Sequence, residues 1–222
     1  MDGNRRWAKE RGALPWDGHK EGVKSVERVI DFCLAQNIPY LSLYTFSLEN
    51  FKRPKQELHF LFSVLLQSIK DRIVTDMVRK NVRISFVGDR ALFPESVIPV
   101  LEEIEAATCN GNVLQVQLLF CYGGRQEIIA GVHTALQKIA RKELAVDALD
   151  EQTFASLLWS GKSPPPEIII RTGGAKRLSN FLLFQAAYSE FFFIDDYWPA
   201  LQSKQLETIL TTYKTRQRNF GA

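Results

Sequence analysis

Short apolar runs alternate with helix-length amphipathic segments along almost the whole chain. The runs 39–46, 82–87 and 113–121 have the length of buried strands, whereas the segments 18–36 and 56–79 repeat apolar residues at helical spacing. A strand that is followed by a helix and then by another strand favours parallel pairing, because the crossover returns the chain to the same end of the sheet. The pattern therefore predicts an α/β fold with a largely parallel central sheet flanked by helices.

The remaining segments continue this alternation. We expect helices at 94–107, 125–140, 151–159 and from about 203, and strands at 167–170 and 191–194. No internal repeat or linker interrupts the pattern, so residues 1–222 are predicted to form a single domain. Two helices carry apolar stripes: Val23, Val26, Ile30 and Cys33 on the first, and Leu58, Phe62, Leu65, Ile69 and Ile73 on the second.

Composition excludes several classes of protein. The chain has 45% hydrophobic and 24% charged residues, as in an ordinary globular domain, and its net charge of +3 is too small to favour nucleic acid as a partner. Three scattered cysteines provide neither a disulfide framework nor zinc-ligand spacing. No apolar run reaches the roughly 18 residues of a membrane span, and the start of the chain is too polar for a signal peptide. We therefore expect a cytoplasmic protein.

The segment that follows residue 170 gives the strongest indication of chemistry. A run of three isoleucines ends there, and the next residues include two arginines, two glycines and a serine: Arg171, Gly173, Gly174, Arg177 and Ser179. These residue types suit a multiply charged oxyanion such as diphosphate, because arginine offers a fork of N–H donors and glycine lets backbone N–H groups approach. The alternative is a surface loop whose arginines are solvated.

The first residues of the chain, MDGNRRW, suit the same kind of ligand. Asp2 could bind Mg²⁺, which usually keeps waters and takes substrate phosphate oxygens as further ligands. The amide of Asn4 and the guanidinium groups of Arg5 and Arg6 could hold the phosphates. Taken alone, Asp-Gly-Asn is also a common turn sequence.

Three polar segments follow predicted strands, at 47–53, 122–125 and 171–179. Ligands of parallel sheets bind beyond the carboxyl ends of the strands. We therefore expect these three segments to lie together.

Together these segments resemble the cis-prenyltransferases, and most closely the bacterial undecaprenyl diphosphate synthases. The resemblance covers essentially the whole chain. It rests on several motifs in order: DGNRRW at the start, Gly18-His19, FSLENFKRP at 46–54, Tyr122-Gly123-Gly124-Arg125, the block 171–185 and Phe220-Gly221.

The resemblance implies an enzyme that uses Mg²⁺ as cofactor. Such an enzyme adds isopentenyl diphosphate repeatedly to an allylic diphosphate, such as farnesyl diphosphate, and each new double bond is cis. The implied product is a long polyprenyl diphosphate such as undecaprenyl diphosphate, a lipid-carrier precursor for cell-wall synthesis. An enzyme with this product is expected to contact the membrane transiently, on its inner face, when the product is released. The resemblance also implies an apolar tunnel for the growing chain, lined by the stripes of the helices at 18–36 and 56–79; the alternative is that these residues pack on the sheet as ordinary core.

The resemblance also assigns roles around the two diphosphates. Asp2 is the expected catalytic metal ligand, and Glu190 is expected to contribute to metal binding. The allylic diphosphate is expected to lie on Gly3, Asn4, Arg5, Arg6 and His19, with Trp7 packing beside the pocket. Isopentenyl diphosphate is expected opposite, on Arg171, Arg177, Leu178 and Ser179.

A third group of residues matches the family's mobile loop, which lies between the two substrates: Ser47, Leu48, Glu49, Asn50, Phe51 and Arg53. Asn50 aligns with a residue that is often described as the proton acceptor. An amide has almost no basicity near neutral pH, so we expect Asn50 to orient the substrate while the departing diphosphate takes the proton.

At several positions the chain departs from the family's pattern. Pro15 stands where the family has an arginine before Gly-His, Phe51 replaces the usual tryptophan, and Ala175 stands where an acidic residue is common. The family's C-terminal Arg-x-Gly reads Asn219-Phe220-Gly221, so we expect Arg218 to make its contact.

Two further expectations concern what surrounds the chain. The family carries a strand directly before the Asp-Gly-Asn loop; here Met1 precedes Asp2, so we expect that strand upstream of the 222 residues. The family also forms homodimers in which each site borrows the partner's C-terminal tail. The aromatic stretch 191–198 offers apolar surface for such a contact.

Two other functions compete with this one. A non-catalytic homologue that serves as a partner subunit or binds prenyl diphosphates would be expected to lose the Asp-Gly-Asn loop and the Arg171 and Arg177 pair, and this chain has both. A generic phosphate-binding α/β protein is less well supported, since no P-loop or GxGxxG motif is present. The trans-type prenyltransferases need two Asp-rich clusters, and the single pair Asp195-Asp196 does not fit one.

Overall fold

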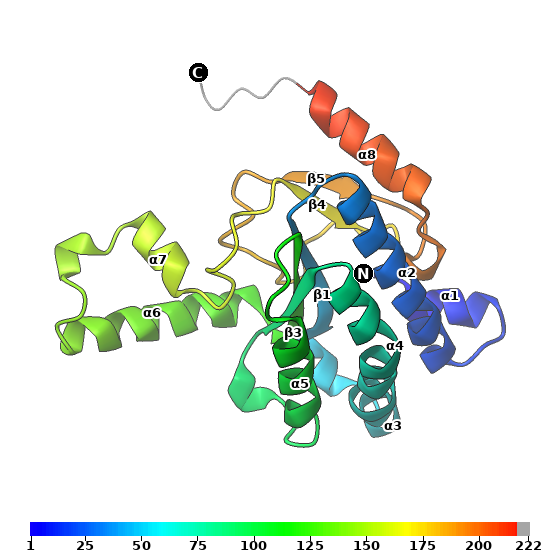
Figure 1. Cartoon of the computed structure of the whole chain (residues 1–222), viewed down its shortest axis with the longest axis horizontal. Coiled ribbons are helices and arrows are strands. Elements are labelled where there is room, and N and C mark those ends of the chain that lie inside the picture. The colour runs from blue at the N-terminus through cyan, green and yellow to red at the C-terminus, as the bar shows by residue number, and fades with distance from the viewer. Residues whose placement is uncertain (217–222) are drawn as a thin grey trace.

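The structure, a computed structural model, describes residues 1–216, and for residues 63–69 and 71–73 it describes the backbone alone. Three strands form one sheet in the order β1 (Tyr40–Ser47), β3 (Leu114–Tyr122), β2 (Val82–Val87), and β4 (Ile168–Arg171) pairs with β5 (Glu190–Phe193) in a second sheet. All of these pairs are parallel. The α/β fold with parallel strands is therefore confirmed, although the strands are divided between two sheets (Figure 1).

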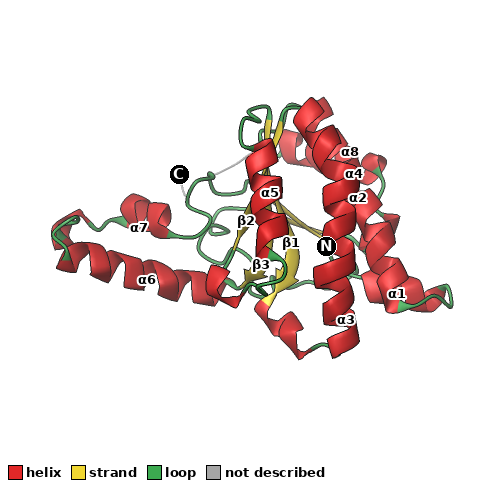
Figure 2. Cartoon of the chain, turned by 60° about the horizontal axis from the view of Figure 1, so that its bottom comes forward, coloured by secondary structure: helices red, strands yellow, loops and turns green. Residues whose placement is uncertain are grey.

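Helices connect the strands as the periodicity predicts. They are α1 (Asn4–Glu10), α2 (Pro15–Ala35), α3 (Lys55–His59), α4 (Leu66–Arg79), α5 (Ile98–Thr108), α6 (Gly124–Ala140), α7 (Glu151–Leu157) and α8 (Ser203–Thr215). The single helix expected at 56–79 is interrupted by a π-helical turn at Phe60–Leu65. In Figure 2, α2, α3, α4 and α5 gather beside the three-stranded sheet, whereas α6 and α7 project away from the body.

The strands alternate between two apolar clusters. In β3, Leu118 and Phe120 belong to the larger core, which α2 and α5 help to form, and Leu119 belongs to a smaller cluster with Leu182. This alternation follows from the two-residue period of a strand. Because Leu182 lies in the segment after β4, the smaller cluster packs that segment against the end of the sheet.

The edges of β1 and β4 face one cavity. Consecutive residues of both strands line it, among them 40–47 and 167–172. Successive side chains of a strand point to opposite faces, so a cavity that all of them reach lies along the strand's edge. No strand of residues 1–216 lies between β1 and β4. The expectation of a strand upstream of Asp2 stays a prediction.

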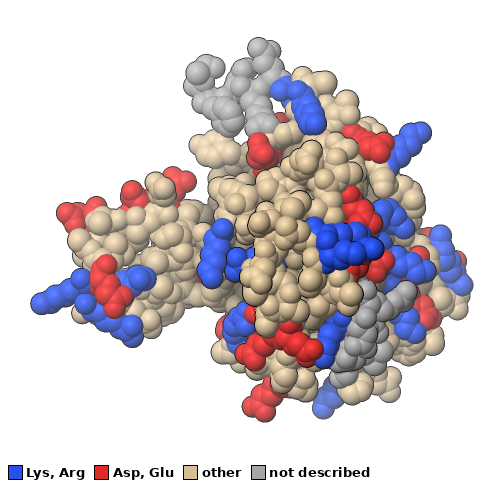
Figure 3. Space-filling model, in the orientation of Figure 1, with Lys and Arg blue, Asp and Glu red and all other residues tan. Residues whose placement is uncertain are grey.

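On the face drawn in Figure 3, Lys and Arg side chains are interspersed with Asp and Glu side chains. No helix within the described residues is long and apolar enough to cross a membrane. The three cysteines are free thiols; Cys33 and Cys121 are buried and Cys109 is exposed.

Candidate active site

Asn180 joins the loops that follow three of the strands. Its side-chain nitrogen donates to Glu49 Oε1 at 3.1 Å and to Gln126 Oε1 at 3.0 Å, and its side-chain oxygen accepts from the N–H of Arg125 at 2.9 Å. Glu49 follows β1, Arg125 and Gln126 follow β3, and Asn180 follows β4. Glu49, Arg125 and Ser179, one residue from each of the three predicted polar segments, also line one cavity, so the predicted meeting of these segments is confirmed.

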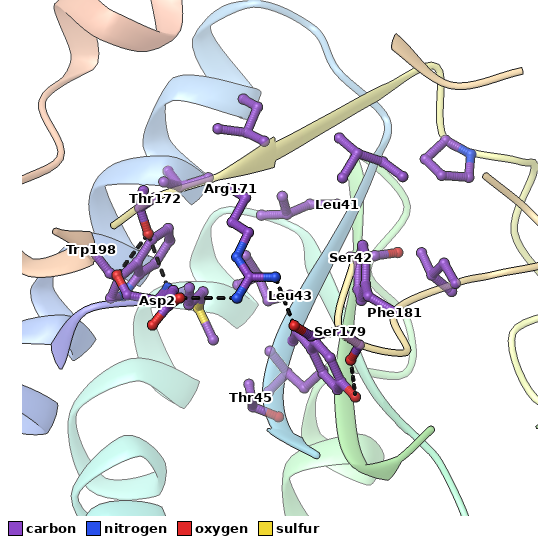
Figure 4. Close-up of a pocket in the computed structure, with 18 of the residues that line it drawn as sticks. Asp2, Leu41, Ser42, Leu43, Thr45, Arg171, Thr172, Ser179, Phe181 and Trp198 are labelled. Atoms are coloured by element: carbon purple, nitrogen blue, oxygen red, sulfur yellow. Dashed lines mark hydrogen bonds and ion pairs between the residues drawn. The ribbon is translucent and has the colours of Figure 1, made fainter. Parts of the chain in front are cut away.

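Thr172 fastens the start of the chain to the end of β4. The backbone N–H of Asp2 donates to Thr172 Oγ1 at 2.9 Å, and the same hydroxyl donates to the carbonyl oxygen of Asp2 at 2.9 Å. The N–H of Trp198 donates to that carbonyl as well, also at 2.9 Å. These bonds hold the Asp-Gly-Asn loop beside Arg171 (Figure 4).

The carboxylate of Asp2 lies between two arginines. Its Oδ2 accepts from Arg171 Nη2 at 3.0 Å, and its Oδ1 lies 3.2 Å from Arg6 Nη2. Arg171 also donates to Ser179 Oγ at 2.8 Å and to the carbonyl of Arg177. The buried Nε of Arg171 has no hydrogen-bond partner within the described part of the chain. A buried donor without an acceptor is unfavourable in a native protein, so this N–H is suited to an anionic ligand.

The same arginines set the charge state of Asp2. Burial raises the pKa of Asp2, but the hydrogen bond and charge of Arg171, and then the charge of Arg6, lower it by more. The net pKa is below the ordinary value for aspartate, so the side chain is ionised at neutral pH. An ionised carboxylate is the form that binds a metal ion.

Two glycines permit this arrangement. Gly3 has φ 103° and Gly173 has φ 83°, a left-handed conformation that side chains rarely adopt. A Cβ on Gly173 would lie 2.6 Å from Arg6 Nη2, and a Cβ on Gly3 would lie 2.5 Å from Cδ1 of Tyr197. Arg6 fills the space between them: it donates to the carbonyl of Gly173 at 2.9 Å, and its guanidinium lies 5.1 Å from the centre of the Tyr197 ring.

Two glycines of α2 let that helix pack directly on the first loop. A Cβ on Gly18 would lie 2.0 Å from the carbonyl oxygen of Asn4, and a Cβ on Gly22 would lie 2.5 Å from Asn4 Oδ1. Asn4 Oδ1 is buried and, among the described residues, has no hydrogen-bond partner. The amide of Asn4 is therefore a second unpaired polar group at the site.

A second charged cluster surrounds Glu57, which sequence reasoning did not single out. Glu57 Oε1 accepts from Arg53 Nη1 at 3.1 Å and lies 3.4 Å from His19 Nε2, and its Oε2 lies 3.8 Å from Arg5 Nε. Burial first, and then the charge of Arg53, lower the pKa of His19, and the hydrogen bond to Glu57 only partly opposes them. His19 is therefore neutral at physiological pH.

The segment after β1 presents a mixture of structural and cavity-lining residues. Asn50 Oδ1 accepts the N–H of Ser47 at 3.1 Å, and both residues line the cavity. Because that oxygen is already an acceptor in the turn, it is poorly placed to take a proton. Leu48 packs on the larger core, and the ring of Phe51 packs edge-on against Phe46 with centroids 5.0 Å apart.

Three of the predicted site residues lie apart from this cluster or are exposed. Trp7 lines neither cavity and instead stacks with Arg11, whose guanidinium lies 4.3 Å from its ring centre. The Arg177 side chain is exposed at the cavity mouth, next to Leu178. Glu190 begins β5 opposite Ile168, at the other end of the strand pair from Arg171.

Within one chain, Glu190 therefore lies away from Asp2. Its Oε2 accepts from Arg216 Nη1 at 2.7 Å. The Arg218 contact and the 219–221 motif lie outside the described residues.

Two cavities meet at the site. The larger has a volume of about 1240 Å³ and the smaller, more polar one a volume of about 730 Å³. Asp2, Asn4, His19 and Arg53 line both. Apolar side chains line the larger cavity away from these residues: Val23, Val26 and Val29 of α2, Leu61, and Phe86, Leu118 and Phe120 of the sheet.

Comparison with known proteins identifies the family. The undecaprenyl diphosphate synthase family model matches residues 1–221. The chain belongs to the cis-prenyltransferase family. The cis-prenyltransferases use an allylic diphosphate and isopentenyl diphosphate as substrates.

The chain is similar to curated cis-prenyltransferases along its whole length. The tritrans,polycis-undecaprenyl-diphosphate synthase (geranylgeranyl-diphosphate specific) of Pyrococcus abyssi is 39% identical over 222 residues, which cover 100% of this chain and 84% of that protein. A ditrans,polycis-undecaprenyl-diphosphate synthase ((2E,6E)-farnesyl-diphosphate specific) of Legionella pneumophila is 37% identical, with 100% and 92% covered.

A solved structure agrees with this assignment. Lavandulyl diphosphate synthase from Lavandula x intermedia, crystallised with dimethylallyl diphosphate, superimposes with a TM-score of 0.94 at 30% identity. The match covers 100% of this chain and 95% of that one. The cis-prenyltransferase fold expected from the sequence is therefore confirmed.

Sequence reasoning missed three residues that organise the site. Thr172 and Asn180 make their contacts with residues 54 to 170 positions away in the chain, and two of the three partners of Glu57 lie 38 and 52 positions away. Asn180 and its neighbour Ser179 are also left-handed, with φ of 67° and 52°. An asparagine next to a run of site residues was the one signal that could have pointed to Asn180, since asparagine tolerates this conformation better than most residues.

Proposed function

We propose that this cis-prenyltransferase condenses isopentenyl diphosphate with farnesyl diphosphate and repeats the addition to give a long polyprenyl diphosphate such as undecaprenyl diphosphate. The observation that carries the proposal is the Asp2 carboxylate held between Arg171 and Arg6, next to a buried and unpaired Arg171 N–H. Such a site suits the diphosphate–metal pair that leaves in this reaction.

The carboxylate of Asp2 is a suitable ligand for Mg²⁺. This ion usually takes one or two carboxylates together with waters and substrate phosphate oxygens. Asp2 is half-exposed and ionised, so we propose it as the metal ligand; Glu190, which pairs with Arg216, could join only from elsewhere in an assembly. When bound, Mg²⁺ would neutralise charge that develops on the leaving diphosphate.

We assign the two diphosphates to two different groups of residues. We assign the allylic diphosphate to the smaller cavity, where Asn4, Arg5, Arg6 and His19 converge. We assign isopentenyl diphosphate to Arg171, Arg177 and Ser179, which form one hydrogen-bonded group after β4. Asp2 contacts Arg6 of the first group and Arg171 of the second, which supports a position for Asp2 between the two substrates.

The new carbon–carbon bond forms as the allylic carbon–oxygen bond breaks, and a proton then leaves the isopentenyl unit. Asn50 does not suit the role of base, because its amide has almost no basicity and its oxygen already accepts the Ser47 N–H. The departing diphosphate, which gains negative charge in this step, is the acceptor that we propose.

The growing chain is proposed to extend into the apolar part of the larger cavity. Of the predicted stripe of α2, Val23 and Val26 line this cavity and Ile30 lies in the core. On the second stripe, Leu58 and Phe62 pack on the core, and the side chains of Leu65, Ile69 and Ile73 lie outside the described residues.

The proposal extends to the cellular setting. A polyprenyl diphosphate product suits a cytoplasmic enzyme that contacts the membrane during product release, with a role in supplying the lipid carrier for cell-wall synthesis. The Legionella relative, which is specific for farnesyl diphosphate, supports that compound as the primer. The Pyrococcus relative, which is specific for geranylgeranyl diphosphate, supports the alternative primer.

A homodimer is also proposed. Phe191 and Phe193 of β5 are more than a third exposed, and their rings stack with centroids 6.4 Å apart. Apolar side chains along α6 (Ile129, Val132 and Leu136) are exposed too. Neighbouring exposed apolar side chains are suited to an interface between two copies of the chain. Trp198, in contrast, is buried and bonded to Gly22, so it adds nothing to this surface.

The test is incubation of the protein with labelled isopentenyl diphosphate, Mg²⁺ and either farnesyl or geranylgeranyl diphosphate, followed by analysis of product length and double-bond geometry. We expect long products with new cis bonds and a preference for farnesyl diphosphate. Tight binding of the primer without any condensation would instead support the non-catalytic homologue.

A further inference from the structure

Glu57 is a buried carboxylate in a short helix, α3, and its side chain is only 6% exposed. It lines neither cavity, whereas the side chains that reach it do. A glutamate that is buried to this degree needs partners, because an isolated charge away from water is strongly unfavourable. Its partners show what the carboxylate does.

Three cationic or protonatable side chains converge on Glu57 from three elements. Arg5 belongs to α1, His19 to α2, and Arg53 to the segment between β1 and α3. The carboxylate takes one N–H of Arg53 at 3.1 Å and lies 3.8 Å from Nε of Arg5. A guanidinium has five N–H donors, so each arginine keeps donors for another anion.

Glu57 also balances charge behind the pocket. Burial lowers the pKa of Arg53, and the charge and hydrogen bond of Glu57 oppose that change. Without the carboxylate, Arg5 and Arg53 would repel each other beside a desolvated histidine. Each guanidinium would then lose the negative partner that holds it at the cavity wall in the absence of substrate.

We propose that Glu57 is a positioning residue for the allylic diphosphate: by holding Arg53, His19 and Arg5 from behind, it presents their remaining donors to the phosphate oxygens. This inference rests on the proposed function for the name of the ligand. The preorganised donors favour binding, because the ordering of long side chains has already occurred in the free protein.

The primary test is Glu57→Gln, which keeps the shape and removes the charge. Glu105→Gln is the matched control: Glu105 belongs to α5, pairs with Arg90 and lines neither cavity. Its bond from the N–H of Phe86 can be kept by the amide oxygen of glutamine. We expect Glu57→Gln to raise the Kd of a non-reactive farnesyl thiodiphosphate, and the KM of farnesyl diphosphate, by about tenfold or more. The KM of isopentenyl diphosphate should change less than about twofold, and Glu105→Gln should change none of these constants.

A double-mutant cycle tests whether Glu57 acts through Arg53. If it does, adding Glu57→Gln to Arg53→Ala should weaken thiodiphosphate binding far less than it does in the wild type, since interacting residues are non-additive. Glu57→Asp, which retains the charge, should recover part of the lost affinity and keeps the test available if Glu57→Gln folds poorly. Equal rises in both KM values, or additive effects of the two variants, would overturn the proposal.

Inorganic diphosphate with Mg²⁺ separates this inference from the proposed function. Its binding by calorimetry requires no turnover. If the wild type binds inorganic diphosphate but makes no polyprenyl product in the condensation assay, the proposed function fails, whereas the effect of Glu57→Gln on diphosphate binding still decides the role of Glu57.

Discussion

Two carboxylates organise arginines at this site, and their surroundings differ. The Asp2 side chain is 35% exposed, lies in a loop and is shared by Arg171 and Arg6. The Glu57 side chain is 6% exposed, lies on a helix and is surrounded by Arg5, Arg53 and His19. Asp2 can therefore exchange an arginine for a ligand, whereas Glu57 is expected to keep its partners.

This difference separates chemistry from positioning. A partly exposed carboxylate can exchange an arginine for a metal ion at a lower cost than a buried one, because solvent screens the original pair more. A buried carboxylate cannot, because breaking its pair would leave an uncompensated charge. The Asp2 cluster is therefore expected to carry metal-dependent steps and the Glu57 cluster to preset the pocket.

The largest effect is expected from Asp2→Ala. Loss of the proposed metal ligand should lower kcat/KM by at least about a thousandfold, roughly 4 kcal/mol of transition-state stabilisation, with little change in the melting temperature. Steady-state kinetics and a thermal melt measure both quantities. A variant that keeps more than about a tenth of wild-type activity would remove Asp2 from the central role.

Arg171→Ala is expected to come next. It removes charged donors from the isopentenyl diphosphate group, and truncation of such a contact costs roughly 2–4 kcal/mol. The KM of isopentenyl diphosphate should therefore rise far more than that of farnesyl diphosphate. Arg177→Ala should act in the same direction but more weakly, since its side chain is exposed. Equal losses for both substrates would show that the two diphosphates have been assigned wrongly.

Gly173→Ala tests the Asp2 cluster without removing any charge. The new Cβ would meet Arg6 Nη2 at 2.6 Å, in a left-handed backbone conformation that costs roughly 1 kcal/mol for alanine. Displacement of Arg6 should lower kcat/KM by about tenfold. A Gly12→Ala control has a left-handed φ of 64° but open space around the Cβ, so it should show the backbone strain alone. Identical kinetics in both variants would argue against a role for Arg6.

Much of the fold and of the Arg171 group could be predicted from the sequence, because the patterns that indicate them lie among neighbouring residues. The β2 strand, 82–87, was predicted with its observed bounds, because an apolar run is a property of neighbouring residues. Arg171 and Ser179 were assigned to one diphosphate group for a similar reason, since the Arg-Gly pattern also lies within a short segment. By contrast, α1 was not predicted: its seven residues carry no apolar period.

Glu57 shows why the rest was hidden. A glutamate in a polar helix is normally on the surface, so nothing near it in the sequence indicates burial. Arg53 is a local partner four positions away, but His19 and Arg5 lie 38 and 52 positions away and meet Glu57 only in the folded chain. The π-helical interruption at Phe60–Leu65 could not be predicted either, since the apolar pattern continues through it without a break.

The smallest effect is expected from pH. Burial alone would raise the pKa of Asp2, but Arg171 and Arg6 lower it below its ordinary value, so as the pH falls the unfolded chain takes the proton first. The stability that Asp2 contributes is therefore fully present above about pH 4 and is lost as the pH falls through the lower, folded pKa. The difference in melting temperature between the wild type and Asp2→Asn should be constant from pH 8 to about 5 and shrink below that. A difference that grows on acidification would contradict the sign of the shift.

The dependence of ligand binding on Mg²⁺ tests the comparison between the two carboxylates most directly. Calorimetric titration of farnesyl thiodiphosphate, with and without Mg²⁺, would be carried out on the wild type, Asp2→Asn and Glu57→Gln. We predict that Mg²⁺ tightens binding by a similar factor in the wild type and in Glu57→Gln, although the latter binds more weakly throughout, and that Asp2→Asn loses the Mg²⁺ effect. Retention of the full Mg²⁺ effect in Asp2→Asn, or its loss in Glu57→Gln, would contradict the division of roles between the two clusters.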